Sequence, residues 1–279
     1  MYAKYLDHLE AKLGNVDFDG LKIGLDCANG ATGVVAEGIF RELGAEVSVI
    51  NNETQYGRKI NENAGSTHIE GLRRLVLEKK LDFGAAFDGD GDRCLLIDSL
   101  GELVDGDQIL AIIAKYLELK QLVATVMANQ GLLNWGEKNG VEIITTDVGD
   151  QNVFREMQEK DIQLGGEQSG HIILPGEAMG DGILTALMIT KIVKESGKTL
   201  SELASEMKKF PQALINLPVA TEQKQNFAER KGVAKEINGR FLIRPSGTED
   251  IIRITVWGED ETKTQKYAEK LVENLKEEI

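Results

Sequence analysis

Three aspartates at alternate positions, Asp88, Asp90 and Asp92, are the residues in this sequence that most directly indicate chemistry. A glycine separates each from the next, and the group directly follows an apolar run. Three carboxylates repel one another at neutral pH, so their grouping favours a hard divalent cation such as Mg²⁺, which prefers oxygen ligands. Arg93 follows at once and adds a fixed cation suited to bidentate phosphate contact. The segment therefore indicates metal-assisted phosphoryl chemistry.

Two other interpretations of the aspartate segment fit less well. An EF-hand loop also opens with Asp-x-Asp-x-Asp, but Arg93 stands where that loop requires glycine and Ser99 where it requires a bidentate glutamate. A solvated acidic turn is the second alternative. Such a turn needs neither glycines strictly interleaved with acids nor an apolar strand leading into it. A metal site is the favoured interpretation.

A second segment combines groups that bind phosphate. Arg244, Ser246, Gly247 and Thr248 lie in a short loop predicted to join two strands. A plain hairpin turn is the alternative, because proline and glycine are common turn residues. The loop nevertheless gathers a guanidinium, two hydroxyls and a glycine that exposes backbone N–H groups, which together form a phosphate cradle. Arg253 in the next strand is placed to close the same pocket, so we expect a phosphate site.

A third segment, residues 165–171, reads Gly-Gly-Glu-Gln-Ser-Gly-His. Its glycines let the backbone approach a ligand closely, and Glu167 and Ser169 alternate so that both can face one way. Oxygen acceptors of this type bind sugar hydroxyls. His171 precedes an apolar strand and is either a histidine at the mouth of that strand or a general acid–base group, an assignment that requires geometry.

Other motifs are weaker. Turn chemistry explains residues 26–31 and 61–68 without any function. Ser66 and His68 suggest a nucleophile and a base, but no oxyanion loop or third partner accompanies them. The sequence has neither a full dinucleotide fingerprint nor a Walker-type Gly-Lys-Ser/Thr, so nucleotide binding is disfavoured.

The composition is that of an ordinary globular protein and excludes some partners. The chain has 279 residues, 42% hydrophobic and 28% charged, which is enough for two or three domains with real cores. A formal net charge of −14 argues against nucleic acid and anionic membranes as partners. No apolar stretch approaches the roughly 18 residues of a membrane span, and residues 1–13 do not resemble a signal peptide. Cys27 and Cys94 are expected to be reduced thiols in a cytoplasmic protein.

Strand and helix patterns alternate along the chain, which predicts an α/β fold. In a first cycle, strands are predicted over 21–26, 45–50, 82–87 and 93–98, and helices over 31–43, 67–80 and 105–119. In a second cycle, strands are predicted over 122–127, 141–146 and 162–166, and helices over 131–138, 151–159, 181–194 and 199–208. The remainder has predicted strands over 213–219, 240–244 and 251–257 and helices over 222–236 and 261–277.

These cycles predict three domains, with Pro211 fitting the second boundary. The expected fold class is α/β, with two tandem α/β domains followed by a small α+β C-terminal domain. The domains are a metal-loop domain over 15–119, a sugar-loop domain over 120–211 and a phosphate-binding domain over 212–279.

Taken together, the order and spacing of the three loops resemble those of the α-D-phosphohexomutase superfamily. Asp88–Arg93 is similar to its metal loop, Gly166–His171 to its sugar loop and Arg244–Thr248 to its phosphate loop. Within the superfamily, the second loop most resembles that of the phosphoglucosamine mutases. The phosphomannomutase/phosphoglucomutase branch more often has methionine where this chain has Gln168.

The resemblance implies a Mg²⁺-dependent isomerase that interconverts glucosamine 6-phosphate and glucosamine 1-phosphate, through a phosphoserine and a bisphosphate sugar intermediate. The residues it assigns fall into four groups: Asp88, Asp90 and Asp92 as metal ligands; Arg93 and His171 as candidate catalytic residues; Glu167 and Ser169 as sugar-binding residues; and Arg244, Ser246, Gly247, Thr248 and Arg253 as ligands of the non-reacting phosphate.

The sequence departs from the family pattern in two places. It contains nothing like the Ser-His-Asn-Pro-type nucleophile loop of the first family domain, so the chain resembles domains two to four of the family. The expected partners are therefore a hexose or hexosamine phosphate, the bisphosphate sugar and a serine domain supplied in trans, and the chain alone is expected to be inactive. The second departure is Asp150-Gln151-Asn152-Val153, where the family usually has Asp-Arg-Tyr-Val.

Alternative functions remain at this point. One is a phosphomannomutase or phosphoglucomutase. Another is a protein that binds sugar phosphates without turnover. The chain itself is interpreted as a fragment, the product of a split gene or a naturally short protein.

Overall fold

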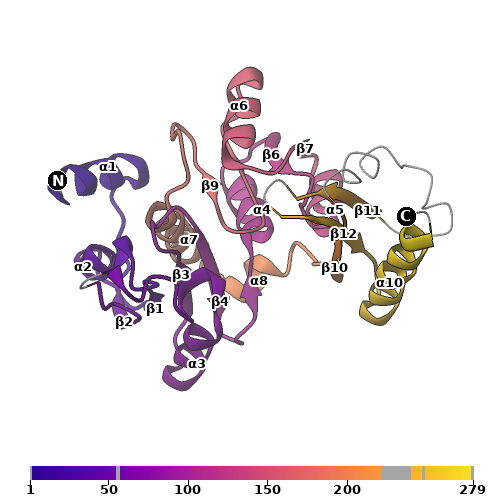
Figure 1. The fold of residues 1–279 in the computed structure, drawn as a ribbon. Helices are drawn as coiled ribbons and strands as arrows, with labels where there is room; N and C mark the ends of the chain where they lie inside the picture. Colours follow the sequence, from indigo (N-terminus) through magenta and orange to yellow (C-terminus); the bar gives the residue numbers. More distant parts are fainter. Residues whose placement is uncertain (1, 55–56, 221–239, 247–248, 278–279) are drawn as a thin grey trace. The chain divides into compact units, whose positions relative to one another are not determined.

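The computed structural model describes residues 2–54, 57–220, 240–246 and 249–277. Its chain forms two compact units, coloured along the sequence in Figure 1. The first unit comprises Met1–Ala128 and Trp135–Lys208, and the second comprises Asn129–Asn134 and Lys209–Ile279. The helix predicted over 222–236 lies outside the described residues. Among the described helices, none has the length and apolar character needed to cross a membrane.

The first sheet of the first unit has the strand order β2-β1-β3-β4-β5. The first three of these strands are parallel, whereas β4 runs antiparallel to β3, and β5 antiparallel to β4. Every residue of β3 and β4 is buried, as expected for strands covered on both faces. The strands are β1 (Lys22–Asp26), β2 (Glu46–Ile50), β3 (Phe83–Phe87), β4 (Cys94–Asp98) and β5 (Leu103–Val104).

Helices pack closely on this sheet. Leu72 and Val76 of α3 (Glu70–Lys79) bury themselves against Ala86 and Ile97. A Cβ at Gly84 would lie 2.7 Å from Leu72 Cδ1, so glycine lets the helix approach the strand backbone. The predicted helix over 31–43 is instead two pieces, η1 (Ala31–Val34) and α2 (Ala36–Glu42), and a short turn, η3 (Gly65–Thr67), precedes α3.

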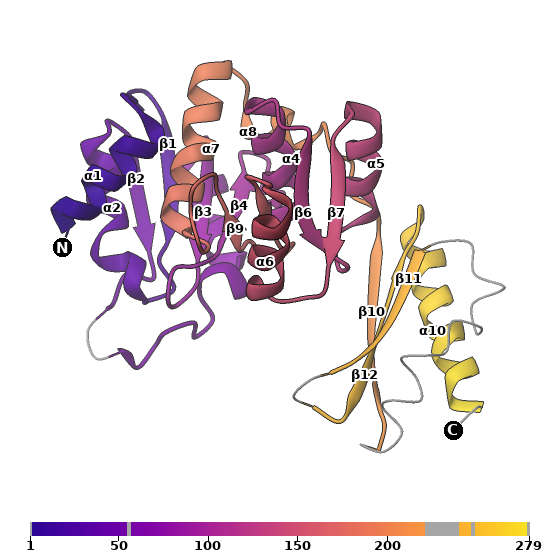
Figure 2. The same cartoon turned by 90° about the horizontal axis from the view of Figure 1, so that it is seen from above.

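The second sheet of the first unit has the order β7-β6-β8-β9. Strand β6 is parallel to β7 and β8, and β9 returns antiparallel to β8. Helix α4 contacts β6 and β8 and also packs against α7 (Gly182–Ser196; Figure 2). The elements are α4 (Gly106–Tyr116), β6 (Gln121–Thr125), α5 (Gln130–Asn139), β7 (Glu142–Thr146), α6 (Asp150–Lys160), β8 (Gly165–Gly166) and β9 (Ile172–Ile173).

Side-chain caps begin several helices of the first unit. Asp105 caps α4 by accepting a hydrogen bond from the Gln108 N–H, as its position predicts. Asp181 caps α7 (Gly182–Ser196) in the same way, and Thr199 forms a capping box at α8 (Leu200–Ala204). The N-terminal helix α1 (Tyr2–Leu13) is joined to the Asp181 cap, because the Tyr5 hydroxyl donates to the Asp181 carboxylate at 2.9 Å.

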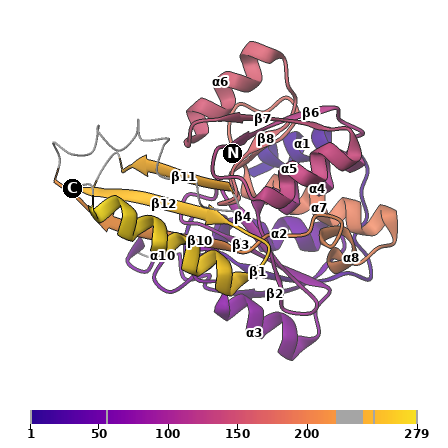
Figure 3. The same cartoon turned by 90° about the vertical axis from the view of Figure 1, so that its right-hand side faces the viewer.

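The second unit contains a three-stranded antiparallel sheet of order β10-β12-β11. Helix α10 lies along one face of it (Figure 3), burying Leu271 and Leu275 against Ile252 and Ile254. Its elements are β10 (Gln212–Pro218), β11 (Arg240–Pro245), β12 (Ile251–Trp257) and α10 (Glu261–Glu277). The prediction of an α/β fold is confirmed, and each predicted domain range contains one of the three sheets of the described residues.

Candidate metal and sugar-phosphate site

The metal loop is the connection between β3 and β4. Phe87 pairs with Cys94 across this hairpin, so residues 88–93 project from its end. Ligand oxygens of Asp88, Asp90 and Asp92 all lie within 4.8 Å of one another, with Asp88 buried, Asp90 exposed and Asp92 half-buried. The structure thus brings together the three residues that the sequence predicts as metal ligands.

The electrostatics of this loop favour a bound cation. Burial, together with the nearby charge of Asp92, raises the pKa of Asp88 to about 6, although the Arg93 backbone N–H donates to its carboxylate. The Arg93 Nε lies 3.6 Å from Asp88 Oδ2 and 3.8 Å from Asp92 Oδ1. One guanidinium among three carboxylates leaves an excess of negative charge. An oxygen-only donor set with that excess fits a hard divalent cation such as Mg²⁺.

Two neighbouring loops pack against the backbone of the metal loop. The Ala31 N–H donates to Gly89 O at 2.9 Å, and a Cβ at Gly30 would lie only 2.3 Å from that oxygen. A Cβ at Gly65 would lie 2.1 Å from Phe87 O, and Gly65 also has a positive φ of 67°. These loops contain the motifs at 26–31 and 61–68, so the structure gives both of them a place against the candidate site.

A buried carboxylate fixes these supporting loops. Asp26 is fully buried and accepts hydrogen bonds from the Ala28 N–H at 3.0 Å and from Asn51 Nδ2 at 2.9 Å. Burial raises its pKa, and these hydrogen bonds act in the opposite direction. One sequence signal was available: Asp26 ends β1 and Asp88 follows β3, and the carboxyl ends of parallel strands share one edge of a sheet.

The sugar loop is the tight connection between β8 and β9. It is closed by hydrogen bonds from the Glu167 N–H to His171 O at 3.0 Å and from the Gly170 N–H to Glu167 O at 2.9 Å. The half-buried Glu167 side chain accepts a hydrogen bond from the Gly149 N–H at 3.0 Å. The Ser169 side chain is exposed. Glu167 is therefore held in one orientation beside the start of α6, where the unusual Gln151 and Asn152 lie.

The metal loop and the sugar loop are joined within the first unit. The Cys94 N–H donates to Gly170 O at 3.0 Å, and Arg93 and His171 form an isolated antiparallel bridge. A Cβ at Gly170 would lie 2.4 Å from Cys94 O, so only glycine permits this approach. The sequence presents the loops as separate motifs; the structure makes them parts of one site.

His171 connects the two loops through its side chain. It is 3% exposed, and its Nδ1 lies 3.1 Å from Asp92 Oδ2. A pocket of about 460 Å³ opens beside this contact, lined in part by Thr32, Asp90, Asp150 and Asp92. Asp150 was not among the predicted site residues, and no local sequence pattern links it to the aspartate loop.

The predicted phosphate ligands lie in the second unit. Arg244 of β11 and Arg253 of β12 are directly opposite each other in the sheet register. Both lie on the face away from α10, because the alternate residues Phe241 and Ile243 pack into the core beneath that helix. Ser246 is buried and its N–H donates to Ile251 O at 3.0 Å, which closes the hairpin. The remaining two predicted ligands, Gly247 and Thr248, lie outside the described residues.

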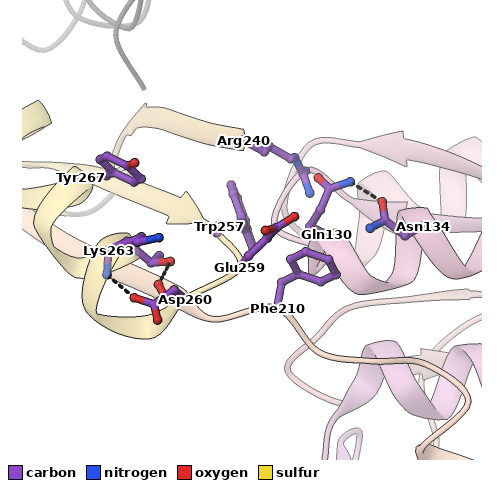
Figure 4. Close-up of a pocket in the computed structure, with 11 residues that line it drawn as sticks. Gln130, Asn134, Phe210, Arg240, Trp257, Glu259, Asp260, Lys263 and Tyr267 are labelled. Carbon is purple, nitrogen blue, oxygen red and sulfur yellow. Dashed lines mark hydrogen bonds between the residues drawn. The ribbon is translucent and has the colours of Figure 1, made fainter. Parts of the chain in front are cut away.

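A separate pocket of about 700 Å³ lies in the second unit (Figure 4). The Arg240 guanidinium stacks over the Trp257 ring at 4.3 Å from its centroid, and Phe210 and Tyr267 contribute further aromatic walls. Gln130 donates a hydrogen bond to Asn134 at its edge. Of the predicted site residues that the structure describes, none lines this pocket. Arg240 is therefore a useful reference for Arg244, four positions along the same strand.

Three family models match consecutive parts of the chain. They are domain II of the phosphoglucomutase/phosphomannomutase family over residues 3–101, domain III over 105–210 and the C-terminal domain over 214–274.

Curated relatives of the chain are named phosphoglucosamine mutase. The protein from Clostridium tetani is 46% identical over 95% of this chain and 63% of its own length. The proteins from Geobacillus kaustophilus and Clostridium acetobutylicum are 46% and 47% identical, over 99% and 96% of this chain and 64% and 63% of their own lengths. The chain thus spans somewhat less than two thirds of the curated relatives that it matches.

Solved structures share the fold. An N-acetylphosphoglucosamine mutase from Aspergillus fumigatus, in complex with GlcNAc-6P and magnesium, matches with a TM-score of 0.82 at 21% identity, covering 98% of this chain and 65% of that one. A phosphoglucomutase/phosphomannomutase family protein from Burkholderia thailandensis matches with a TM-score of 0.79 at 19% identity, covering 97% of this chain and 64% of that one. With domain models matching nearly its whole length and relatives above 45% identity, the chain belongs to the phosphoglucomutase/phosphomannomutase family, within the α-D-phosphohexomutases.

Proposed function

We propose that this chain supplies the metal, sugar and phosphate sites of a Mg²⁺-dependent phosphoglucosamine mutase, which interconverts glucosamine 6-phosphate and glucosamine 1-phosphate. One observation carries the proposal: the cluster of Asp88, Asp90 and Asp92, with Arg93 beside it, is joined directly to the sugar loop of Glu167. Relatives named phosphoglucosamine mutase support the choice of substrate.

At the metal end, the chain's own residues position and neutralise a phosphoryl group. Asp88, Asp90 and Asp92 hold Mg²⁺, which when bound supplies a Lewis-acid charge for the phosphoryl oxygens. Arg93 adds a guanidinium beside the same loop. Phosphoryl transfer depends on positioning and charge neutralisation more than on covalent help from the protein, and such an arrangement provides both.

At the sugar and phosphate ends, the residues select and hold the substrate. Glu167, oriented by the Gly149 N–H, accepts hydrogen bonds from sugar hydroxyls together with the exposed Ser169. The opposed Arg244 and Arg253 grip the phosphate that does not react. Ser246, Gly247 and Thr248 complete this cradle in the proposal.

The phosphoryl donor is assigned to a phosphoserine that is not among these 279 residues. No segment of the sequence resembles the family's nucleophile loop. In the proposed reaction, the serine phosphate passes to the free hydroxyl of the sugar phosphate, and the resulting bisphosphate sugar returns its other phosphate to the serine. A serine domain, on the same polypeptide or in trans, is therefore a proposed partner. Cys27 and Cys94 are both buried free thiols, which supports work in a reducing cytoplasm.

The experiment is a coupled assay for glucosamine 1-phosphate formation with Mg²⁺, glucosamine 6-phosphate and glucose 1,6-bisphosphate. We expect no turnover from the 279-residue chain alone and turnover after addition of a purified domain I from a full-length relative. Asp90→Asn is the matched control, because it should abolish the restored activity without removing domain I. Faster turnover of mannose or glucose phosphates by the restored enzyme would instead assign the phosphomannomutase/phosphoglucomutase activity.

Two outcomes would contradict the proposal. The first is failure of domain I to restore any turnover even though the chain binds glucosamine 6-phosphate, which would favour a binding protein. The second is turnover by the chain alone after contaminating mutase has been removed. This result would place the nucleophile within these residues, with Ser66 as the first residue to substitute.

A further inference from the structure

The side chain of His171 makes two hydrogen bonds that together fix its protonation pattern. The Gly180 backbone N–H donates to Nε2 at 3.0 Å, so Nε2 presents its lone pair and carries no proton. The neutral ring must then carry its proton on Nδ1, which lies 3.1 Å from Asp92 Oδ2 and donates to it. Both ring nitrogens are thereby engaged within the protein.

The backbone around His171 leaves the ring little freedom. A Cβ at Gly180 would lie 2.8 Å from both Nδ1 and Cε1 of His171 and 2.6 Å from Asp92 O. The His171 backbone is itself bridged to Arg93, the residue that follows Asp92. The His171 side chain is 4% exposed, so water has little access to either ring nitrogen. The ring is therefore fixed relative to the metal loop from two sides.

We propose that His171 is a positioning residue for the metal site: as the Nδ1–H tautomer, it holds the Asp92 carboxylate in the orientation that binds the cation. The inference rests on the proposed function, because it takes the three aspartates as metal ligands. It assigns no proton transfer to His171. It also gives the sugar loop a direct effect on metal affinity, since His171 closes that loop through its carbonyl.

The asymmetry of the two hydrogen bonds provides a matched pair of variants. An asparagine amide nitrogen reaches the position of Nδ1, so His171→Asn keeps a donor for Asp92. A glutamine amide reaches the position of Nε2, so His171→Gln keeps the Gly180 contact and loses the donor for Asp92. The two variants are similar in polarity, both remove the imidazole and each keeps one of its two contacts, so weaker Mn²⁺ binding by His171→Gln than by His171→Asn would show that the Nδ1 contact with Asp92 is the one that matters.

The experiment titrates the 279-residue chain with Mn²⁺ and measures free Mn²⁺ by electron paramagnetic resonance. We expect His171→Ala and His171→Gln to weaken Mn²⁺ binding by about 10- to 100-fold, the usual effect of removing a group that orients a metal ligand. His171→Asn should stay within about threefold of the unsubstituted chain, because it restores the donor. In an Asp92→Asn background, His171→Ala should cause little further loss, because the two residues act as one unit.

Each other outcome overturns a defined part of the argument. Unchanged Mn²⁺ affinity in His171→Gln, with a folded circular dichroism spectrum, would refute the positioning role and leave the proposed function intact. Absence of Mn²⁺ binding by the unsubstituted chain would refute the metal assignment itself and the inference with it. Loss of domain I-restored turnover in His171→Asn at unchanged Mn²⁺ affinity would make the imidazole a proton carrier, contrary to the proposal.

Discussion

At the scale of single residues, the opposed arginines of the second unit explain why an anion is expected there. Arg244 and Arg253 occupy directly opposite positions on neighbouring strands. Like charges in such positions destabilise a sheet. Glu249 offsets part of this repulsion through its ion pair with Arg253 at 2.9 Å. A phosphate dianion is a suitable ligand for two guanidinium groups placed side by side, which supports the proposed phosphate site.

Replacement of Arg244 by alanine tests this explanation. Arg244→Ala should weaken binding of glucosamine 6-phosphate by about 1.5–3 kcal/mol, or roughly 10- to 150-fold in Kd, because charged hydrogen bonds are lost. Isothermal titration calorimetry measures the change. Arg240→Ala is the matched control, since Arg240 lies on the same face of the same strand but stacks on Trp257. Equal losses in both variants would mean that the phosphate site is misplaced.

The buried Asp26 carboxyl predicts a specific pH dependence. Burial raises its pKa above the ordinary 3.8, so the folded chain binds this proton more tightly than the unfolded chain does. Its contribution to stability is therefore complete below the unfolded pKa and is lost as pH rises through the folded pKa. The asparagine side chain of the Asp26→Asn variant does not titrate. The free energy of unfolding of the natural chain minus that of the variant should therefore fall as pH rises above about 4.

Urea unfolding followed by circular dichroism gives this difference at each pH. The variant serves as the control for all other titrating groups, because they are common to both proteins. If this difference in the free energy of unfolding stays constant or grows with pH, burial does not raise the pKa of Asp26. The hydrogen bonds from Ala28 and Asn51 would then be the dominant influence on it.

At the scale of elements, the site is made where strand ends and loops converge. The parallel strands β1, β2 and β3 bring residues 27–31, 51–54 and 88–93, which follow them, to one edge of the first sheet. The β8–β9 turn then meets this edge through the Cys94–Gly170 hydrogen bond. Backbone contacts through glycines hold these loops together, so the side chains of the site are positioned by rigid neighbours.

The aspartate loop could be predicted from sequence because its information is contiguous. Three predicted ligands, two glycines and an arginine stand within six positions, and the apolar strand before them sets their place in the fold. The phosphate loop is predicted for the same reason. In contrast, the contact between His171 and Asp92 joins residues 79 positions apart, and no local pattern encodes it. Local sequence accounts for the loop at 26–31 by turn chemistry alone. Its contact with Gly89 cannot be predicted, because Gly89 is also distant in sequence.

Helix boundaries show the same limit of local information. Apolar periodicity over 31–43 predicts one helix, but the chain breaks at Val35, which has φ −128° and ψ −32°. Ahead of the break, Gly30 and Ala31 are drawn against Gly89, so tertiary contact with the metal loop determines the break. The helix over 261–277 is found as predicted.

Docking of the first helix gives a prediction at this scale. The Tyr5 hydroxyl lies 2.9 Å from both oxygens of Asp181, the cap of α7. Tyr5→Phe should lower the free energy of unfolding by about 1.5 kcal/mol, the low end for hydrogen bonds to charged groups because the contact is only partly buried. Thermal unfolding measures it. Tyr2→Phe, at a tyrosine of the same helix whose hydroxyl bonds Glu42 at an exposed position, should change stability by less than about 0.5 kcal/mol. Equal effects would argue against the Asp181 contact.

At the scale of the whole molecule, the chain has a net negative charge, which repels an anionic substrate from the proposed sites. With 46 acidic and 32 basic residues, the formal charge is −14. Fields from distant charges are screened beyond about 10 Å at 0.1 M salt, so an anionic substrate responds mainly to the cations nearest to it. In the proposed function, binding therefore depends on local groups, with Arg93 in the first unit and Arg244 and Arg253 in the second.

The two tryptophans allow the units to be observed separately. Trp135 belongs to the first unit and Trp257 to the second, and both are buried, at 4% and 1% exposure. Trp257→Phe leaves a reporter of the first unit, and Trp135→Phe leaves a reporter of the second. Because the predicted metal ligands all lie in the first unit, Mg²⁺ at 100 times its Kd should stabilise the Trp135 reporter by about 2.7 kcal/mol. The Trp257 reporter should not respond.

Urea unfolding followed by fluorescence, with and without Mg²⁺, measures both responses. Asp90→Asn in the Trp257→Phe background is the control, because loss of a ligand should remove the stabilisation while leaving the reporter in place. Equal shifts of both reporters would mean that the units unfold as one cooperative body, so that binding at either site stabilises the whole chain. If the unfolding transition reported by Trp135 does not shift with Mg²⁺, the first unit has no cation site. A shift confined to Trp135 would mean that the first unit, which carries the predicted metal ligands, unfolds independently of the second.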